Sequence, residues 1–292
     1  MAPDVRVGDT FRRTRLMTQE DFRRFADLSG DTNPIHVDPE FARSTHFGRT
    51  VSHGMLLYSM LCAFLVDLFP GAHQVRHEMV FPTGTPSGEL VTFHVTVRTF
   101  APGREVHMAV QVVRPEGELG LTGETWLRWP DGAADAAAPS PSPASAAGQA
   151  WGASGRRGPG SDLRRAAQAR LELGLQATLE RSFSLADRAT YLELAGAGAD
   201  STPTVPPALI GGLFSNLLGT VLPGSGTNYL RQRMTCQRPA GYGEALTATV
   251  RVVRLRPEKG LVDLETLCTG ETGDTVCSGE ALVLAKERFA RA

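Results

Sequence analysis

The feature that most constrains the fold of this 292-residue chain is an internal repeat. Five sites in the first half have counterparts in the second half, at separations that drift only from 153 to 156 residues. The matched sites are Pro70-Gly71 with Pro223-Gly224, Met79 with Met234, Glu89 with Glu244, Val97 with Val252, and Gly123-Glu124 with Gly279-Glu280. Repetition at a nearly constant separation indicates one duplicated unit, so both halves are expected to share one fold.

A segment of biased composition separates the two copies. Residues 131–162 are dominated by Ala, Pro, Ser and Gly. Such a composition cannot bury enough apolar surface to offset the conformational entropy that ordering would cost. We therefore predict a first domain at 1–130, a linker at 131–162 and a second domain at 163–292.

Each copy reads as a long apolar helix followed by alternating strands. The run from Met55 to Phe69 is apolar on nearly every side, which predicts a helix surrounded by protein and ended by Pro70-Gly71. The segments 73–81, 89–100, 104–113 and 119–129 alternate apolar and polar residues, which predicts an antiparallel sheet with one covered face. Upstream, Thr18 is expected to cap an amphipathic helix that ends at Ser29-Gly30. The predicted class is α+β, with a sheet around one apolar helix occurring twice.

Composition argues against several kinds of protein. Lys and Arg total 30 against 31 for Asp and Glu, so no overall field favours nucleic acid or an anionic membrane. The apolar run at 55–69 is too short to cross a bilayer, and the polar N-terminus lacks the apolar core of a signal peptide. No CxxC pair occurs, which predicts reduced thiols in a cytoplasmic protein. The four cysteines are Cys62, Cys236, Cys268 and Cys277.

Reactive side chains gather between residues 29 and 56. Pro34 and Pro39 rule out a continuous helix, so Asp31, Asn33 and His36 are expected on an irregular segment. A carboxylate and an imidazole five residues apart on such a loop can face one cleft, share a water molecule and transfer protons near neutral pH. The same Asp-Thr-Asn-Pro sequence is also typical of a plain turn, because Asp and Asn side chains bond to their own backbone.

The second copy lacks this polar segment. The stretch from Asp31 to the opening of the central helix spans 20 residues in the first copy and five in the second. All seven histidines lie in the first half, and His53-Gly54 is replaced by Pro207-Ala208. The difference favours a catalytic role for Asp31 and His36, since one copy keeps reactive side chains and the other keeps only the scaffold.

The segments Ser-Gly-Asp-Thr-Asn-Pro-Ile-His at 29–36 and Thr-Val-Ser-His-Gly-Met-Leu at 50–56 closely resemble the hydratase signature of the MaoC-like, (R)-specific enoyl-CoA hydratase family. A looser likeness extends over 10–129 and, more weakly, over 180–286. The resemblance implies that each unit is a hotdog domain, an antiparallel sheet wrapped around a central helix. It also implies that the two tandem domains form a pseudo-dimer within one chain.

The resemblance implies catalytic roles for three residues. Asp31 and His36 would hold the water that adds across the double bond, and the amide of Gly54 would polarise the thioester carbonyl. Hydration builds negative charge on that carbonyl oxygen, which an N–H at the positive end of a helix stabilises. A residue without a side chain would also let the thioester approach closely. The candidates for substrate binding are Asn33, Ser52 and His53, and for the last two a purely structural role fits equally well.

The activity that the resemblance implies is reversible hydration of trans-2-enoyl thioesters, carried by CoA or an acyl carrier protein, to (R)-3-hydroxyacyl thioesters. No cofactor is implied, and no metal is expected because HExxH and clustered-cysteine spacings are missing from the sequence. Two alternatives stay open, an acyl-CoA thioesterase of the hotdog fold and a non-catalytic acyl-thioester-binding partner subunit. Whether two chains associate as a homodimer of pseudo-dimers also stays open.

Overall fold

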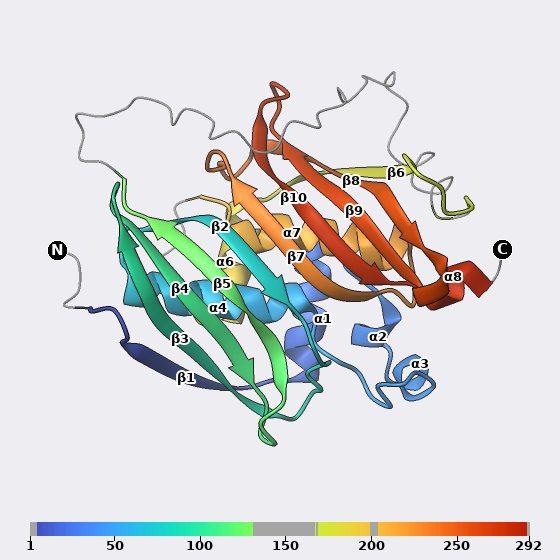
Figure 1. Cartoon of the computed structure of the whole chain (residues 1–292), viewed down its shortest axis with the longest axis horizontal. Coiled ribbons are helices and arrows are strands. Elements are labelled where there is room, and N and C mark those ends of the chain that lie inside the picture. Colours follow the sequence, from blue (N-terminus) through green and yellow to red (C-terminus); the bar gives the residue numbers. More distant parts are fainter. Residues whose placement is uncertain (1–4, 131–166, 168, 199–203, 291–292) are drawn as a thin grey trace.

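The structure is a computed structural model that describes residues 5–130, 167, 169–198 and 204–290 (Figure 1). The predicted linker at 131–162 lies outside the described residues. The first half contains β1 Thr10–Leu16, α1 Gln19–Ser29, α2 Pro34–Val37, α3 Pro39–Arg43, α4 Gly54–Leu68, β2 His73–Val80, β3 Leu90–Ala101, β4 Glu105–Val113 and β5 Leu119–Arg128. The second half contains β6 Gln176–Ser182, α6 Leu185–Ala195, α7 Pro207–Asn216, the π-helical turn η1 Leu217–Val221, β7 Asn228–Cys236, β8 Ala245–Arg256, the 3-10 turn η2 Pro257–Lys259, β9 Leu261–Thr269, β10 Thr275–Leu284 and α8 Lys286–Ala290.

The strands form one antiparallel sheet in the order β1-β3-β4-β5-β2-β7-β10-β9-β8-β6. The order is symmetric about the centre of the sheet. From either edge inward, β1, β3, β4, β5 and β2 of the first half correspond to β6, β8, β9, β10 and β7 of the second half. The two halves join where β2 pairs with β7, with Arg76 opposite Thr235 and Val80 opposite Arg231. This edge-to-edge pairing of two like units confirms the predicted tandem hotdog pseudo-dimer.

Both central helices lie behind the sheet in Figure 1 and pack against each other. α4 is buried along almost its whole length, with Met55 and Tyr58 fully inaccessible to solvent. A helix that is apolar all round is stable only inside a protein, which explains why each half-sheet wraps around one. Because α4 packs on α7, the two halves share one continuous hydrophobic core.

The predicted strands of the first half match β2, β3, β4 and β5 to within about two residues. Thr18 caps α1 as expected, and Gly30 ends it in the left-handed conformation with φ 79°. The expectation of an irregular segment around His36 was wrong, because residues 34–37 form the one-turn helix α2. Pro34 occupies its first turn, where a missing N–H breaks no hydrogen bond, and Asn33 caps it.

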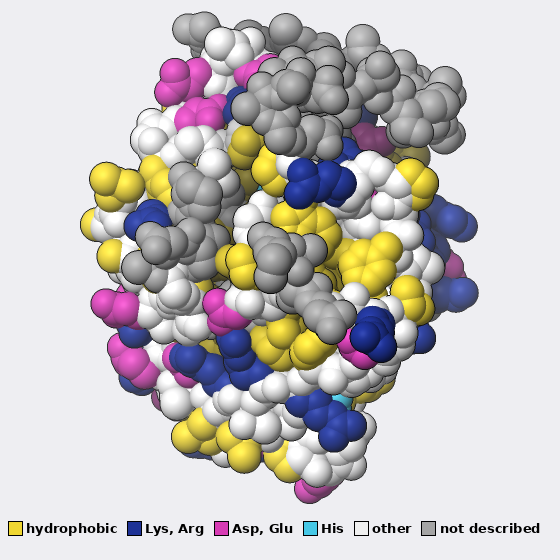
Figure 2. All heavy atoms as spheres, turned by 90° about the vertical axis from the view of Figure 1, so that its left-hand side faces the viewer, with side chains coloured by type: hydrophobic (Ala, Val, Ile, Leu, Met, Phe, Trp, Pro, Cys, Tyr) yellow, Lys and Arg dark blue, Asp and Glu magenta, His cyan; other side chains and the backbone are white. Residues whose placement is uncertain are grey.

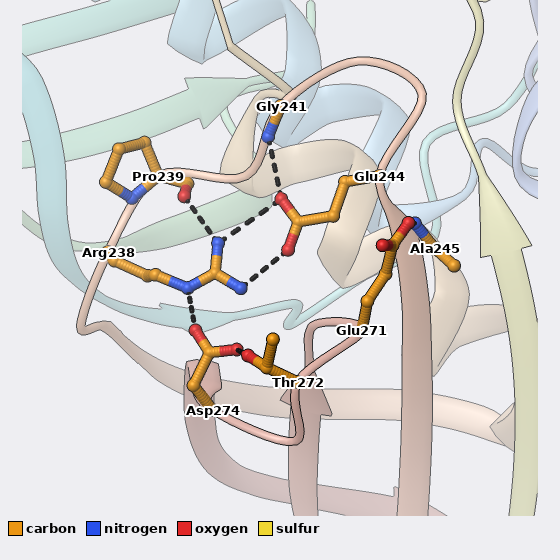
Figure 3. Close-up of polar contacts among 8 residues, drawn as sticks. All are labelled: Arg238, Pro239, Gly241, Glu244, Ala245, Glu271, Thr272 and Asp274. Atoms are coloured by element: carbon orange, nitrogen blue, oxygen red, sulfur yellow. Dashed lines mark hydrogen bonds and ion pairs between the residues drawn. The ribbon is translucent and has the colours of Figure 1, made fainter.

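Glu89 and Glu244, which are counterparts in the internal repeat, each precede a long strand, β3 and β8 respectively. Glu89 accepts hydrogen bonds from Arg114 Nε at 2.7 Å and Nη2 at 2.8 Å. Glu244 accepts one from Arg238 Nη2 at 2.6 Å, and Arg238 also pairs with Asp274 (Figure 3). These carboxylates therefore tie the start of a long strand to a neighbouring loop in both copies.

Charged side chains of both signs are interspersed with apolar ones on the face drawn in Figure 2. Within the described residues, no helix combines the length and the apolar character that crossing a membrane requires.

His77 is a buried titratable group beside the junction of the halves, and it makes stability depend on pH. Its Nδ1 lies 2.5 Å from the Tyr58 hydroxyl, and burial lowers the pKa of His77 to about 3. Between pH 6.5 and that value, the unfolded chain binds a proton at this position that the folded chain does not. The free energy of unfolding should therefore fall as the pH falls, by ~2 to 3 kcal/mol from this residue at about pH 4.5.

We expect His77→Gln to show a smaller loss of stability between neutral pH and about pH 4.5 than the wild type in urea unfolding. His46→Gln, which changes an exposed histidine, should keep the wild-type dependence. Identical pH dependence in the wild type and His77→Gln would contradict this account of His77.

Candidate active site

A pocket lies between the two halves, and both contribute to its wall. The first half supplies the segment after α1, the start of α4, the loop after β2 and the start of β5. The second half supplies the end of α7, η1 and the start of β7. The residues that line it include Asp31, Asn33, His36, Ser52, Gly54, Phe81, Ser215, Gly219, Thr227 and Tyr229.

The Asp31 carboxylate is held at the pocket wall by hydrogen bonds from both halves. Gly30 turns the chain out of α1, so that Asp31 leaves the helix axis and enters the pocket. Its Oδ2 accepts a hydrogen bond from Ser215 Oγ at 2.6 Å, and its Oδ1 accepts one from the backbone N–H of Asn33 at 3.3 Å. Asp31 is only 1% exposed, so these bonds fix a carboxylate that solvent hardly reaches.

The His36 imidazole presents an acceptor nitrogen. Its Nδ1 lies 2.7 Å from the Val51 carbonyl oxygen. A carbonyl can only accept, so Nδ1 carries the hydrogen and Nε2 keeps its lone pair. Burial lowers the pKa of His36, while the negative charge of Asp31 acts in the opposite direction. The ring is therefore neutral near neutral pH, the form needed to accept a proton.

His53 supports the site from behind instead of lining the pocket. Its ring stacks on that of His36 with the centroids 3.8 Å apart, and its Nε2 donates to the Asp31 carbonyl oxygen at 2.9 Å. Burial, and then the neighbouring His36, hold the pKa of His53 well below its usual value. A neutral His53 thus fixes the backbone of Asp31 and the plane of His36.

Asp31, His36 and His53 offer ligand atoms within 4.8 Å of one another, a grouping that sequence spacing did not reveal. Metal ligation requires in-plane lone pairs that converge on one point. The two imidazole rings are stacked with 30° between their planes, and one nitrogen of each ring is engaged by a backbone carbonyl. The arrangement therefore fits a hydrogen-bonded cluster better than a metal centre.

Gly54 is the first residue of α4, and His53 makes no side-chain cap to this end. The first N–H groups of a helix have no acceptor within the helix, so this end can donate to a ligand. The glycine is required by a neighbour that the sequence did not suggest, because a Cβ here would lie 2.7 Å from the Phe81 ring. In the second copy the helix begins with Pro207, which has no N–H, so the first residue of that helix cannot donate a hydrogen bond.

Asn33 and Ser52, both candidates for substrate binding, line the pocket. Asn33 Nδ2 donates to the Thr227 carbonyl oxygen at 3.3 Å, which ties the Asp31 segment to the second half. Ser52 donates through Oγ to the His53 carbonyl oxygen at 3.0 Å. Asp31, Asn33, His36, Ser52 and Gly54 are thus brought to one pocket, with His53 behind them.

Sequence reasoning missed the contribution of the second half. Ser215 holds the Asp31 carboxylate, and a Cβ at Gly219 would lie 2.9 Å from Asp31 Oδ1 and 3.2 Å from Asn33 Cβ. Gly219 belongs to the π-helical turn η1, a local feature that is frequent at functional sites. The only available signal was the glycine inside an otherwise apolar helix, which by itself indicates a close approach of some other group.

Comparison with known proteins shows which family and which fold this chain resembles. The family model described as MaoC like domain matches residues 5–116. The (R)-specific enoyl-CoA hydratase of Aeromonas caviae is 34% identical over 132 residues, which cover 44% of this chain and 98% of that protein. The mitochondrial 3-hydroxyacyl-[acyl-carrier-protein] dehydratase of Arabidopsis thaliana is 42% identical over 77 residues, 26% of this chain, and the match spans only 46% of its length.

The fold of the whole chain also has a solved counterpart. A Mycobacterium tuberculosis protein described as having a double hotdog fold superposes with a TM-score of 0.67 at 13% identity, covering 96% of this chain and 97% of that one. The architecture is thus that of a double hotdog protein. The chain belongs to the MaoC-like, (R)-specific enoyl-CoA hydratase family.

Proposed function

We propose that the chain catalyses the reversible hydration of trans-2-enoyl thioesters to (R)-3-hydroxyacyl thioesters. The observation that supports this function is the pocket in which the Asp31 carboxylate and the unprotonated Nε2 of His36 lie with the uncapped start of α4 at Gly54. The Aeromonas caviae relative is named for the same (R)-specific hydration.

In the proposed reaction, Asp31 and His36 each accept a hydrogen bond from the same water molecule. The water oxygen bonds to C3 of the substrate while the C2=C3 electron pair moves toward the thioester. Gly54 N–H donates to the carbonyl oxygen on which negative charge develops. The Asp31–His36 pair takes one proton from the water and returns a proton to C2 on the same face, so that the elements of water are added with nothing left over.

The assay that tests this function uses crotonyl-CoA and longer enoyl-CoA substrates with simultaneous detection of free thiol. Hydration predicts loss of the absorbance of the conjugated double bond without thiol release. Thiol release would instead identify a thioesterase, and binding without turnover would identify a partner subunit. Parallel substrates on an acyl carrier protein decide which carrier the enzyme prefers.

Gly219→Ala is expected to lower kcat by roughly 10- to 100-fold, since displacing a catalytic group by even part of an ångström is costly. The added Cβ would contact Asp31 Oδ1 at 2.9 Å, so the carboxylate must move. Gly241→Ala, a second-half glycine with open space around it, is the matched control and should keep wild-type rates. Equal rates for both variants would show that η1 does not position Asp31.

Two further expectations accompany this function. The four cysteines are free thiols in the structure, which fits a reducing cytoplasm. We also propose that two chains associate as a homodimer of pseudo-dimers, which light scattering at several protein concentrations would test.

A further inference from the structure

Tyr229 lines the pocket, and its phenol hydroxyl has no hydrogen-bond partner in the part of the chain that the structure describes. The residue lies near the start of β7, the strand by which the second half joins the first. Its hydroxyl oxygen is buried and has no hydrogen-bond partner among the described residues. An unsatisfied buried hydroxyl destabilises a folded protein, so such a group usually binds a partner that is not part of the protein itself.

The chain on either side of Tyr229 is fixed to the reactive parts of the site. Two residues earlier, the Thr227 carbonyl oxygen accepts the hydrogen bond from Asn33. One residue later, the Leu230 carbonyl oxygen accepts from the Phe81 amide at 2.9 Å. The Tyr229 ring packs on the Phe81 ring with the centroids 5.7 Å apart, and Phe81 is the ring against which Gly54 rests. Tyr229 therefore lies between the Asp31 segment and the start of α4.

Tyr229 is also electrostatically linked to the carboxylate. Burial, and then the negative charge of Asp31, raise the pKa of the Tyr229 phenol. A phenol with a raised pKa stays protonated throughout the range in which His36 is neutral. Tyr229 is therefore a hydrogen-bond donor in a site where Asp31 and His36 Nε2 are both acceptors.

The hydrogen-bonding capacity of one water molecule shows what such a donor can do. Water donates two hydrogen bonds and accepts two. In the proposed reaction both hydrogens point to Asp31 and His36, and one lone pair must face C3. The second lone pair needs a donor, and a donor there leaves only one lone pair free to attack.

We propose that Tyr229 is a fourth catalytic residue, whose hydroxyl donates a hydrogen bond to the oxygen that is added to C3 or lost from it. In hydration this bond orients the water, and in dehydration it stabilises the departing oxygen. The phenol proton stays on Tyr229 throughout. The inference rests on the proposed hydratase function, because it assigns Tyr229 to the reacting oxygen.

The kinetic test compares the full-length wild type with Tyr229→Phe, which keeps the ring on Phe81 and removes only the hydroxyl. We expect kcat to fall about tenfold or more in both directions while KM for crotonyl-CoA stays within about twofold. Tyr242→Phe removes another buried hydroxyl of the second half, outside the pocket lining, and should keep wild-type kcat. An unchanged kcat for Tyr229→Phe would overturn the proposal.

A binding measurement tests Tyr229 without relying on turnover. Calorimetry would compare (R)-3-hydroxybutyryl-CoA with butyryl-CoA, which lacks the oxygen at C3. The wild type should bind the hydroxylated ligand more tightly. In Tyr229→Phe the ratio of the two dissociation constants, butyryl-CoA over (R)-3-hydroxybutyryl-CoA, should be about three- to tenfold smaller than in the wild type. An unchanged preference would refute the role of Tyr229, whereas a wild type that binds both ligands but turns over no enoyl thioester would refute the hydratase function alone.

Discussion

Asp31→Asn is expected to lower kcat for enoyl-thioester hydration by roughly 10²- to 10⁴-fold, the range typical of general acid–base groups. The substitution keeps the size of the side chain and an oxygen that can accept from Ser215 Oγ, which lies 2.6 Å from the carboxylate. The substitution removes the negative charge and the second oxygen, which would accept a hydrogen bond from the water. Steady-state rates with crotonyl-CoA measure the effect.

The matched control is Asp27→Asn, which neutralises an exposed aspartate on α1 one turn before the site. It should retain wild-type kcat and stability. If Asp31→Asn turned over at the wild-type rate with a normal unfolding midpoint, the assignment of Asp31 as a proton-transferring group would be wrong.

His36→Ala is expected to cause a loss of similar size, roughly 10²- to 10⁴-fold in kcat, because Nε2 of His36 is the second acceptor for the water. The pH profile adds a signature of the imidazole. Burial lowers the pKa of His36, so the acid limb of kcat/KM in the wild type should have its midpoint below about 6.5. That limb arises as Nε2 becomes protonated, and the residual activity of His36→Ala should lack it.

His94→Ala provides the control for a histidine change, since His94 lies on β3 and is not part of the pocket wall. Its rate and pH profile should match the wild type. A wild-type acid limb that persists in His36→Ala would show that another group controls the protonation step.

Much of the fold could be predicted from the sequence because local chemistry and tertiary structure agree there. Apolar and polar residues alternate along 89–100, a pattern that fits a strand and does not fit a helix. The structure forms β3 there, at Leu90–Ala101. The apolar run at 55–69 admits no exposed face, and α4 is buried accordingly. The short helix α2 was missed because prolines predict breaks as readily as helix starts, and only the cap formed by Asn33 decides between them.

The candidate site was predictable only as far as one continuous motif extends. Asp31, His36 and Gly54 lie within 24 residues of one another and meet in the pocket. Ser215, Gly219 and Tyr229 reach the same pocket from the other half through the pairing of β2 with β7 and the packing of α4 on α7. Apart from the glycine at position 219, nothing local in those segments indicates the contact. A second reason for glycine at position 54 was missed in the same way, since it depends on where the Phe81 ring packs.

A crystal structure of the protein soaked with (R)-3-hydroxybutyryl-CoA tests the central claim most directly. We expect the 3-oxygen to lie within hydrogen-bonding distance of both Asp31 and His36 Nε2, with the thioester oxygen facing the amide of Gly54. A ligand bound with its 3-oxygen away from these two side chains, or with its thioester remote from the start of α4, would contradict it.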